Sequence, residues 1–421
     1  MSTTAASKAQ LDLASRFRSA RQRTLALCKP LTPEDMMVQS CPEASPAKWH
    51  LAHTAWFFES FILSPFLNKY RLFNEDFPWL FNSYYRGFSE FPEKKLRSSF
   101  SRPALDEILR YRGCVDEGID ELLENNPEPE VLKRVELGVN HEEQHQELLL
   151  TDILHAFCTN PLRPAYVSDA AVFGQSAVRP LQFVQFAGGL VDVGFTGGGF
   201  CYDNELPRHR VWLEPFALAD RLVTNGEYAA FIADGGYQRS ELWLSAGWDL
   251  VEQQRWRAPL YWKAEGDNWT LFTLRGEMPL EAVKHAPVSQ VSYFEADAFA
   301  RWAGKRLPTE SEWETASAGH QIAGNLMDTG LLMPTPAPEP DGPAQLWGDC
   351  WEWTASAYLG YPGFEPLAGS LGEYNGKFMS GQMVLRGGSC ATPEAHIRSS
   401  YRNFFQPETR WQFSGIRLAE K

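Results

Sequence analysis

Two histidines four residues apart constrain this chain more than any other feature. They are His141 and His145, in a stretch of helical composition that runs from Gly138 to Leu150. In an α-helix, residues four apart project from the same face one turn apart, so both imidazoles can reach one metal ion. The spacing therefore predicts a helix that carries a metal site.

Glu142 directly follows the first histidine, as in the H-E-x-x-H pattern of zinc proteases. In that pattern the glutamate acts as the general base. Many metals accept two imidazoles at this spacing, so the motif alone leaves the identity of the metal open.

The first half of the chain has the periodicity of a helix bundle. Apolar residues recur at helical spacing between Ala5 and Leu27, and a second helical stretch, 47–59, follows a proline-rich break. Two further stretches, about 103–125 and 129–157, bring the number of predicted helices to four. Helix bundles hold metal sites on the inward faces of neighbouring helices, so a bundle suits the histidine pair.

A third imidazole has to come from another helix, and the obvious source is the segment from Trp49 to His53. His50 and His53 are three residues apart, so both could lie near one face. We favour His53 as the ligand, although a single histidine in such a helix is more often a hydrogen-bonded core residue. The other histidines are isolated in sequence and are expected to be structural: His155, His209, His285, His320 and His396.

The composition changes after the bundle. Proline, alanine, serine and glycine dominate from Cys158 to Pro180, and short alternating apolar stretches with glycine turns begin near Phe183. We therefore expect an α+β protein with two domains: a four-helix bundle at 1–165, a linker at 166–182 and an irregular α+β domain at 183–421. Five prolines within 334–343 predict a surface loop.

Charge and cysteine usage limit the partners of the protein. The formal net charge is −14 and no Lys/Arg-rich run occurs, which argues against a nucleic-acid-binding surface and favours small-molecule substrates. Without a secretion signal or 18 uninterrupted apolar residues, we expect a cytoplasmic protein with no membrane partner. The seven cysteines are scattered and never in C-x-x-C spacing, so we expect reduced thiols.

Five blocks of the second half, in order, resemble the formylglycine-generating-enzyme (sulfatase-modifying-factor) fold, a C-type-lectin-like domain. The blocks are 187–189, 222–228, 302–314, 351–354 and 386–389. The first half resembles a DinB-like four-helix bundle through Leu51-Ala52-His53 and the pair His141 and His145. The combination resembles the EgtB-type sulfoxide synthases of ergothioneine biosynthesis, which are non-haem iron enzymes.

This resemblance implies an Fe(II) site of three neutral imidazoles, which transfer onto His53, His141 and His145. Such enzymes use O2 to join the sulfur of a thiol to C2 of the imidazole of hercynine (N-α-trimethylhistidine), giving a sulfoxide. Three nitrogen ligands on one face leave positions for both substrates and O2. Holding the reactants on one ion supplies proximity and orientation.

The resemblance also assigns substrate contacts. Gln144 matches a glutamine that hydrogen-bonds the substrate, and Asn403 matches an asparagine that meets hercynine. Members that use γ-glutamylcysteine have Trp-Asp at the next two positions, where this chain has Phe404 and Phe405. Because that aspartate is missing, we expect cysteine as the sulfur donor, with γ-glutamylcysteine as the alternative. Phe404 could offer its ring to the trimethylammonium group, and both phenylalanines could instead be core residues.

Members of this family use an active-site tyrosine as a proton donor, a role that suits an un-ionised phenol at neutral pH. The candidates are Tyr84 and Tyr85, between bundle helices, and Tyr358 and Tyr361 in the second half. We favour Tyr84 or Tyr85, because the second half departs from the Trp-Asp pattern. Arg86 could bind the cysteine carboxylate through a bidentate pair, or it could be an ordinary surface arginine.

Three other functions remain to be weighed. A formylglycine-generating enzyme would need two late cysteines, and only Cys390 follows the block 386–389. A DinB-type metal-dependent thiol transferase would use the same three histidines without O2. A non-enzymatic lectin-like binding module would need no metal in the bundle. The resemblance also allows a structural Ca or Na ion in the second domain, and the oligomeric state stays open.

Overall fold

The computed structural model describes residues 2–125, 127–168, 180–266, 268–338 and 342–420. Residue contacts divide the chain into two compact units. The helical unit consists of Met1–Thr159 together with Ala368–Tyr374, and the mixed unit consists of Asn160–Leu367 together with Asn375–Lys421. Most of the predicted linker, residues 169–179, lies outside the described residues.

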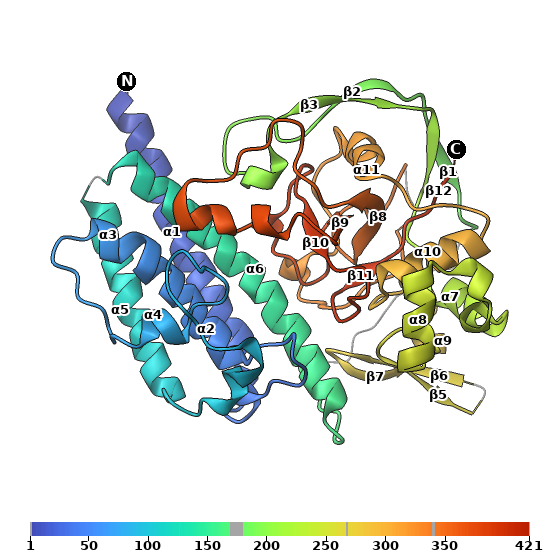
Figure 1. Ribbon diagram of the computed structural model, residues 1–421, viewed down its shortest axis with the longest axis horizontal. Coiled ribbons are helices and arrows are strands. Elements are labelled where there is room, and N and C mark those ends of the chain that lie inside the picture. Colours follow the sequence, from blue (N-terminus) through green and yellow to red (C-terminus); the bar gives the residue numbers. More distant parts are fainter. Residues whose placement is uncertain (1, 126, 169–179, 267, 339–341, 421) are drawn as a thin grey trace. The chain divides into compact units, whose positions relative to one another are not determined.

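Four long helices form the helical unit, as the periodicity predicted (Figure 1). They are α1 (Ser2–Cys28), α2 (Ala47–Phe58), α5 (Leu105–Glu124) and α6 (Pro129–Thr159). The helix α2 continues as a π-helical turn, η2 (Glu59–Leu63), and then as α3 (Ser64–Phe66). Short helices in the connections are η1 (Asp35–Met37), α4 (Phe77–Leu80) and η3 (Lys94–Ser99).

Every residue of α2 is buried, including its two histidines. A helix that is mostly apolar on all sides belongs in a core rather than on a surface, and α2 packs against both α5 and α6. Its polar side chains therefore need partners inside the bundle. This requirement makes α2 and its neighbour α6 the place to look for a functional cluster.

One segment of the second half of the sequence belongs to the helical unit. The 3-10 helix η8 (Gly369–Glu373) has contacts with the bundle, and the Glu373 carboxylate accepts hydrogen bonds from the backbone N–H groups of Arg86 and Gly87. The sequence-based division had placed these residues in the second domain. A short stretch far along the chain thus completes the surroundings of the bundle loop that carries Tyr84 and Tyr85.

The mixed unit contains small sheets joined by helices and loops (Figure 1). One antiparallel sheet has the order β1-β4-β12. A mixed sheet has the order β10-β9-β8-β11, in which β11 pairs parallel with β8, and β2-β3 and β5-β6-β7 form two further antiparallel sheets. The first strands are β1 (Phe183–Phe186), β2 (Gly189–Val193), β3 (His209–Leu213), β4 (Phe216–Ala219), β5 (Trp262–Glu265) and β6 (Asn268–Thr273). The others are β7 (Gly276–Pro279), β8 (Trp351–Ala357), β9 (Met383–Arg386), β10 (Asn403–Phe405), β11 (Ser414–Gly415) and β12 (Ala419–Glu420).

The α-helices described in the mixed unit are α7 (Asn225–Ala233), α8 (Ser245–Gln254), α9 (Leu280–Val283), α10 (Tyr293–Trp302) and α11 (Glu310–Ser317). Capping boxes start three of these α-helices. At α7, α10 and α11 a Thr or Ser side chain accepts from the third backbone N–H, while the glutamate at that position reaches back to the cap. Because these pairs satisfy otherwise unpaired N–H groups, the helix starts are encoded locally.

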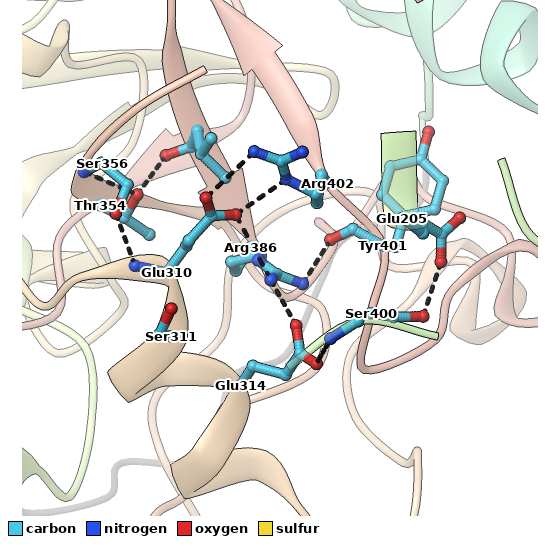
Figure 2. Close-up of polar contacts among 12 residues, drawn as sticks. Glu205, Glu310, Ser311, Glu314, Thr354, Ser356, Arg386, Ser400, Tyr401 and Arg402 are labelled. Carbon is cyan, nitrogen blue, oxygen red and sulfur yellow. Dashed lines mark hydrogen bonds and ion pairs between the residues drawn. The ribbon is translucent and has the colours of Figure 1, made fainter. Parts of the chain in front are cut away.

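Buried ion pairs hold the end of β9 and Arg402, which directly precedes β10, to α11 (Figure 2). Arg402 donates to both carboxylate oxygens of Glu310, at 2.9 and 3.0 Å, and Arg386 lies 2.5 Å from Glu314. A buried charge is tolerated only when it is paired and hydrogen-bonded, as these are. The pairs fix the backbone at Arg402, next to the predicted substrate contact Asn403.

Two sequence-based expectations concern loops and membranes. Within 334–343, the described residues contain neither helix nor strand, as the prolines predicted, and residues 339–341 lie outside the described part. Across the described parts of the chain, none of the helices has the length and apolar character that a membrane span requires.

Candidate metal centre

Three histidines meet inside the helical unit. His53 comes from α2, and His141 and His145 come from successive turns of α6. One ring nitrogen from each lies within 4.8 Å of the others, and this is the only such group of metal-binding side chains among the described residues. The i, i+4 pair and its partner from the second helix therefore come together as the sequence predicted.

The ring nitrogens of this cluster are available for a ligand. The Nδ1–H of His53 donates to the carbonyl oxygen of Phe81 at 2.6 Å, which leaves Nε2 with a lone pair. That Nε2 and both ring nitrogens of His141 are buried without a hydrogen-bond partner among the described residues. Buried polar atoms in proteins are nearly always hydrogen-bonded, so these nitrogens fit a site built for a metal ion.

Burial also keeps the three imidazoles neutral. It lowers the pKa of His141 to about 3. Burial, followed by the closeness of the other histidines, lowers the pKa of both His53 and His145 well below the usual range. Because only a neutral imidazole has a lone pair for a metal, this arrangement is suited to coordination at physiological pH.

Aromatic rings fix the plane of the His53 imidazole. Trp49 stacks on one side of it, with ring centroids 4.4 Å apart, and Trp56 stacks at 5.2 Å. The guanidinium of Arg97 lies 3.4 Å from the centroid of the Trp49 ring. These stacked groups hold the His53 ring in place and keep water away from it.

His50, the alternative ligand on α2, lies behind His145 instead of joining the cluster. Its Nδ1 is 2.8 Å from Nδ1 of His145, and its Nε2 is 3.0 Å from the Asp152 carboxylate. Both of its nitrogens are therefore occupied by protein groups. The structure thus places the two histidines, which the sequence could not separate, in different surroundings.

Glu142 does not face the histidine cluster as a base would. Its carboxylate accepts from Arg21 at 2.9 Å, from Arg112 at 2.8 Å and from Thr24 at 2.7 Å. Burial would raise the pKa of Glu142, but the two guanidinium groups hold it at about 2. A carboxylate that is this strongly paired is a poor proton acceptor, so the zinc-protease role of this position is not supported.

Tyr374 contacts the cluster directly, and Tyr85 packs on Trp56, which in turn stacks on His53. The rings of Tyr84 and Tyr85 stack 4.5 Å apart with their hydroxyl oxygens 3.4 Å apart. The Tyr374 ring centroid is 5.7 Å from that of His141, and its hydroxyl donates to Oε1 of Gln144. Burial and, for Tyr85, the nearby phenols of Tyr84 and Tyr374 raise the pKa of both loop tyrosines, which keeps their protons in place.

Sequence reasoning missed Tyr374. It belongs to no motif that the sequence offered, and 230 residues separate it from Gln144. Only the placement of η8 in the helical unit brings it to the histidines. The guanidinium of Arg86, by contrast, lies over the ring of Phe91 in an exposed position, so its role in binding a carboxylate stays a prediction.

The remaining candidates lie in the mixed unit. Phe404 stacks on Tyr358 with ring centroids 4.0 Å apart, and the Tyr358 hydroxyl accepts from Asn204. The Tyr361 ring lies 4.0 Å from the Arg402 guanidinium, and its hydroxyl donates to Glu310 at 3.4 Å. Both tyrosines therefore have structural partners.

The three residues of β10 are half-buried, which leaves part of each side chain accessible. They are Asn403, Phe404 and Phe405. The Oδ1 of Asn403 accepts from the backbone N–H of Phe404 at 2.9 Å. Their roles as substrate contacts stay predictions.

Family models match both halves of the chain. Residues 16–149 match the DinB superfamily, and residues 169–330 and 335–421 match the sulfatase-modifying factor enzyme 1-like domain. These matches confirm the predicted two-domain α+β architecture, a DinB-like bundle followed by a C-type-lectin-like domain.

Two hercynine oxygenases match nearly the whole chain, and a third relative matches about half of it. A hercynine oxygenase of Mycobacterium tuberculosis is 33% identical, over 97% of this chain and 98% of that protein. A hercynine oxygenase of Mycolicibacterium smegmatis is 32% identical, over 98% of this chain and 99% of that protein. Ergothioneine biosynthesis protein 1 of Schizosaccharomyces pombe is 29% identical, over 52% of this chain and 28% of that protein.

Proposed function

The chain belongs to the hercynine oxygenase family, and we propose that it binds Fe(II) through His53, His141 and His145. It is an oxygenase of ergothioneine biosynthesis, the role that the resemblance to sulfoxide synthases implied. The observation that carries the iron proposal is the cluster of neutral imidazoles, in which Nε2 of His53 and both ring nitrogens of His141 are buried without a hydrogen-bond partner among the described residues. When bound, Fe(II) would supply open coordination positions for O2 and the substrates.

The protein's own groups would hold the reactants and supply protons. Gln144, between the two ligands on α6, is held by Tyr374 and is our candidate for the contact with hercynine. The phenols of the half-buried Tyr84 and the buried Tyr85 would provide a proton for the reaction, since their raised pKa keeps them protonated. The tryptophans around His53 would exclude water from the site.

Cysteine is the sulfur donor that we propose, with γ-glutamylcysteine as the alternative. The longer thiol has an additional amine, which a carboxylate should meet. In this chain positions 404 and 405 are both phenylalanine, so that pair of positions offers no carboxylate. Hercynine, cysteine and O2 would together give hercynylcysteine sulfoxide and one molecule of water, which takes up the second oxygen atom and the hydrogens lost from the imidazole C2 and the thiol.

A product assay with matched thiols tests this function. Protein loaded with Fe(II) under anaerobic conditions is given hercynine, air and either cysteine or γ-glutamylcysteine, and the products are identified by mass spectrometry. We expect the sulfoxide with cysteine at the higher rate, O2 consumption in step with product, and no metal retention or product from His141→Ala. Absence of a C–S bonded sulfoxide with both thiols would refute the proposal.

The same assay separates the two other candidate functions. A thiol transferase would form its product without O2, and a binding module would take up no stoichiometric metal.

Two further proposals concern the location of the protein in the cell and a structural ion in the mixed unit. We propose a cytoplasmic location, which is consistent with seven cysteines that all lie in described residues and form no disulfide. A structural Ca or Na ion in the mixed unit is proposed from family likeness alone, and metal analysis of a variant that lacks the histidine ligands would detect it.

A further inference from the structure

A line of three side chains runs from a buried carboxylate to one of the proposed ligands. Asp152 and His145 are seven residues apart on α6, which places them two turns apart on one face. His50 of α2 bridges them, with its Nε2 3.0 Å from Asp152 and its Nδ1 2.8 Å from Nδ1 of His145. His50 is 2% exposed and Asp152 is 8% exposed, so water has little access to these contacts.

The positions of the protons follow from these two distances. Asp152 is an acceptor, so the Nε2 of His50 carries the proton that it donates to the carboxylate. The Nδ1 of a neutral His50 is then a lone pair, and the facing Nδ1 of His145 has to carry the proton between the two rings. His145 is left with an unprotonated Nε2.

The carboxylate at the start of this line is itself held in place. The backbone N–H of Ser45 donates to Asp152 at 2.8 Å, and Arg97 donates to the hydroxyl of the same serine at 2.8 Å. The buried contacts therefore fix Asp152 as well as His50. Each hydrogen bond along this line is then donated toward Asp152: His145 donates to His50, and His50 donates to the carboxylate.

We propose that His50 and Asp152 are positioning residues that set the tautomer and ring orientation of His145, so that its Nε2 is presented to the metal. This inference rests on the proposed three-histidine site. His53 obtains the same orientation from the carbonyl oxygen of Phe81. In metalloproteins, a partner on the second nitrogen of a ligating histidine fixes its tautomer, and its removal costs about 10–100-fold in metal affinity.

Two substitutions of His50 isolate the acceptor for His145. His50→Leu removes it, whereas His50→Asn keeps an amide oxygen close to the position of the original Nδ1. Both variants lose the N–H that faces Asp152, so they differ mainly in the contact with His145. The probe is Co(II), titrated into the full-length apo-protein and followed by its visible absorption spectrum, with apo-protein unfolding measured in parallel.

We expect His50→Leu to bind Co(II) about 10–100-fold more weakly with an altered spectrum, and His50→Asn to stay within about threefold of wild type. Asp152→Asn provides a second test. The amide of the new side chain can donate to Nε2 of His50, which would move the His50 proton to Nδ1 and leave Nδ1 of His145 as the acceptor. This variant should also bind Co(II) more weakly. His155→Leu, on the same helix but in contact with Ser40, is the control and should bind as wild type.

The outcomes separate this inference from the function on which it rests. If wild-type protein takes up no stoichiometric Co(II), the proposed metal site fails and the positioning role fails with it. If wild type binds Co(II) and His50→Leu binds equally well, only the positioning role is refuted. Equal weakening in His50→Leu and His50→Asn would refute the role of His50 as the acceptor for His145, since the two variants differ mainly in that contact. If His50→Leu does not fold, unchanged binding by Asp152→Asn refutes it.

Discussion

Tyr374 donates a hydrogen bond to the side-chain oxygen of Gln144, although 230 residues separate them. Gln144 lies on α6 between the two proposed ligands of that helix, and Tyr374 comes from the segment that joins the helical unit late in the sequence. The bond determines which end of the Gln144 amide faces the phenol. It therefore links the orientation of a predicted substrate contact to a residue that no local motif indicates.

Tyr374→Phe tests this link. Loss of one neutral hydrogen bond is worth about 1 kcal/mol, so we expect KM for hercynine to rise about fivefold with a smaller change in kcat. Tyr70→Phe is the matched control, because that hydroxyl bonds Glu59 in the same unit. Steady-state kinetics with varied hercynine measure the effect, and an unchanged KM in Tyr374→Phe would show that the bond does not orient a substrate contact.

The stacked pair Tyr84 and Tyr85 is expected to determine whether O2 is used to form the sulfoxide or to oxidise cysteine alone. A general acid contributes about 10²–10⁴-fold, so replacing the proton donor by Phe should slow sulfoxide formation at least about 100-fold. Oxygen should then be diverted to oxidation of cysteine alone. Mass spectrometry of both products in Tyr84→Phe and Tyr85→Phe identifies the donor. Wild-type product ratios in both variants would instead assign the proton to Tyr374, Tyr358 or Tyr361.

Local sequence patterns predicted much of the fold and part of the site. The pair His141 and His145 needed only the period of a helix, which is a property of neighbouring residues. Thr224 and Glu227, like the equivalent pairs at α10 and α11, encode a helix start within four residues. Such features are visible without knowledge of the tertiary structure.

The rest of the site depends on contacts between distant segments. Whether His50 or His53 joins the cluster is decided by Asp152 and Phe81, which engage nitrogens of the two rings. The role of Glu142 likewise depends on arginines contributed by α1 and α5. A sequence pattern reports spacing along one element, and it holds no information on which partners tertiary packing will supply.

Glu142→Gln distinguishes a buried structural carboxylate from a general base. Removing the charge leaves Arg21 and Arg112 without their buried partner, and breaking such a pair costs about 3–5 kcal/mol of unfolding free energy. Glu136→Gln on the same helix is the control, because its pair with Arg16 is partly exposed and worth at most about 1 kcal/mol. Urea unfolding of the apo-proteins measures both. Wild-type stability combined with lost turnover would restore the general-base role.

Asp349 in the mixed unit should make stability depend on pH in the direction opposite to most carboxylates. Burial raises its pKa to about 6, against the hydrogen bonds from Asn325 and Thr335, whereas the unfolded chain has the usual value near 3.8. Between these two values the folded state keeps a proton that the unfolded state releases. The unfolding free energy therefore falls as pH rises from about 4 to about 6, and is lower by up to about 3 kcal/mol above that window.

Asp349→Asn removes this dependence, because an amide does not ionise and its oxygen can still accept from Asn325 and Thr335. We expect the variant to be more stable than wild type at pH 7, with the difference vanishing near pH 4. Urea unfolding across this range measures it, with the exposed substitution Asp12→Asn as control. A variant less stable than wild type at pH 7 would contradict the expectation, since it would mean that the ionised carboxylate stabilises the fold, as it would when bound to a cation.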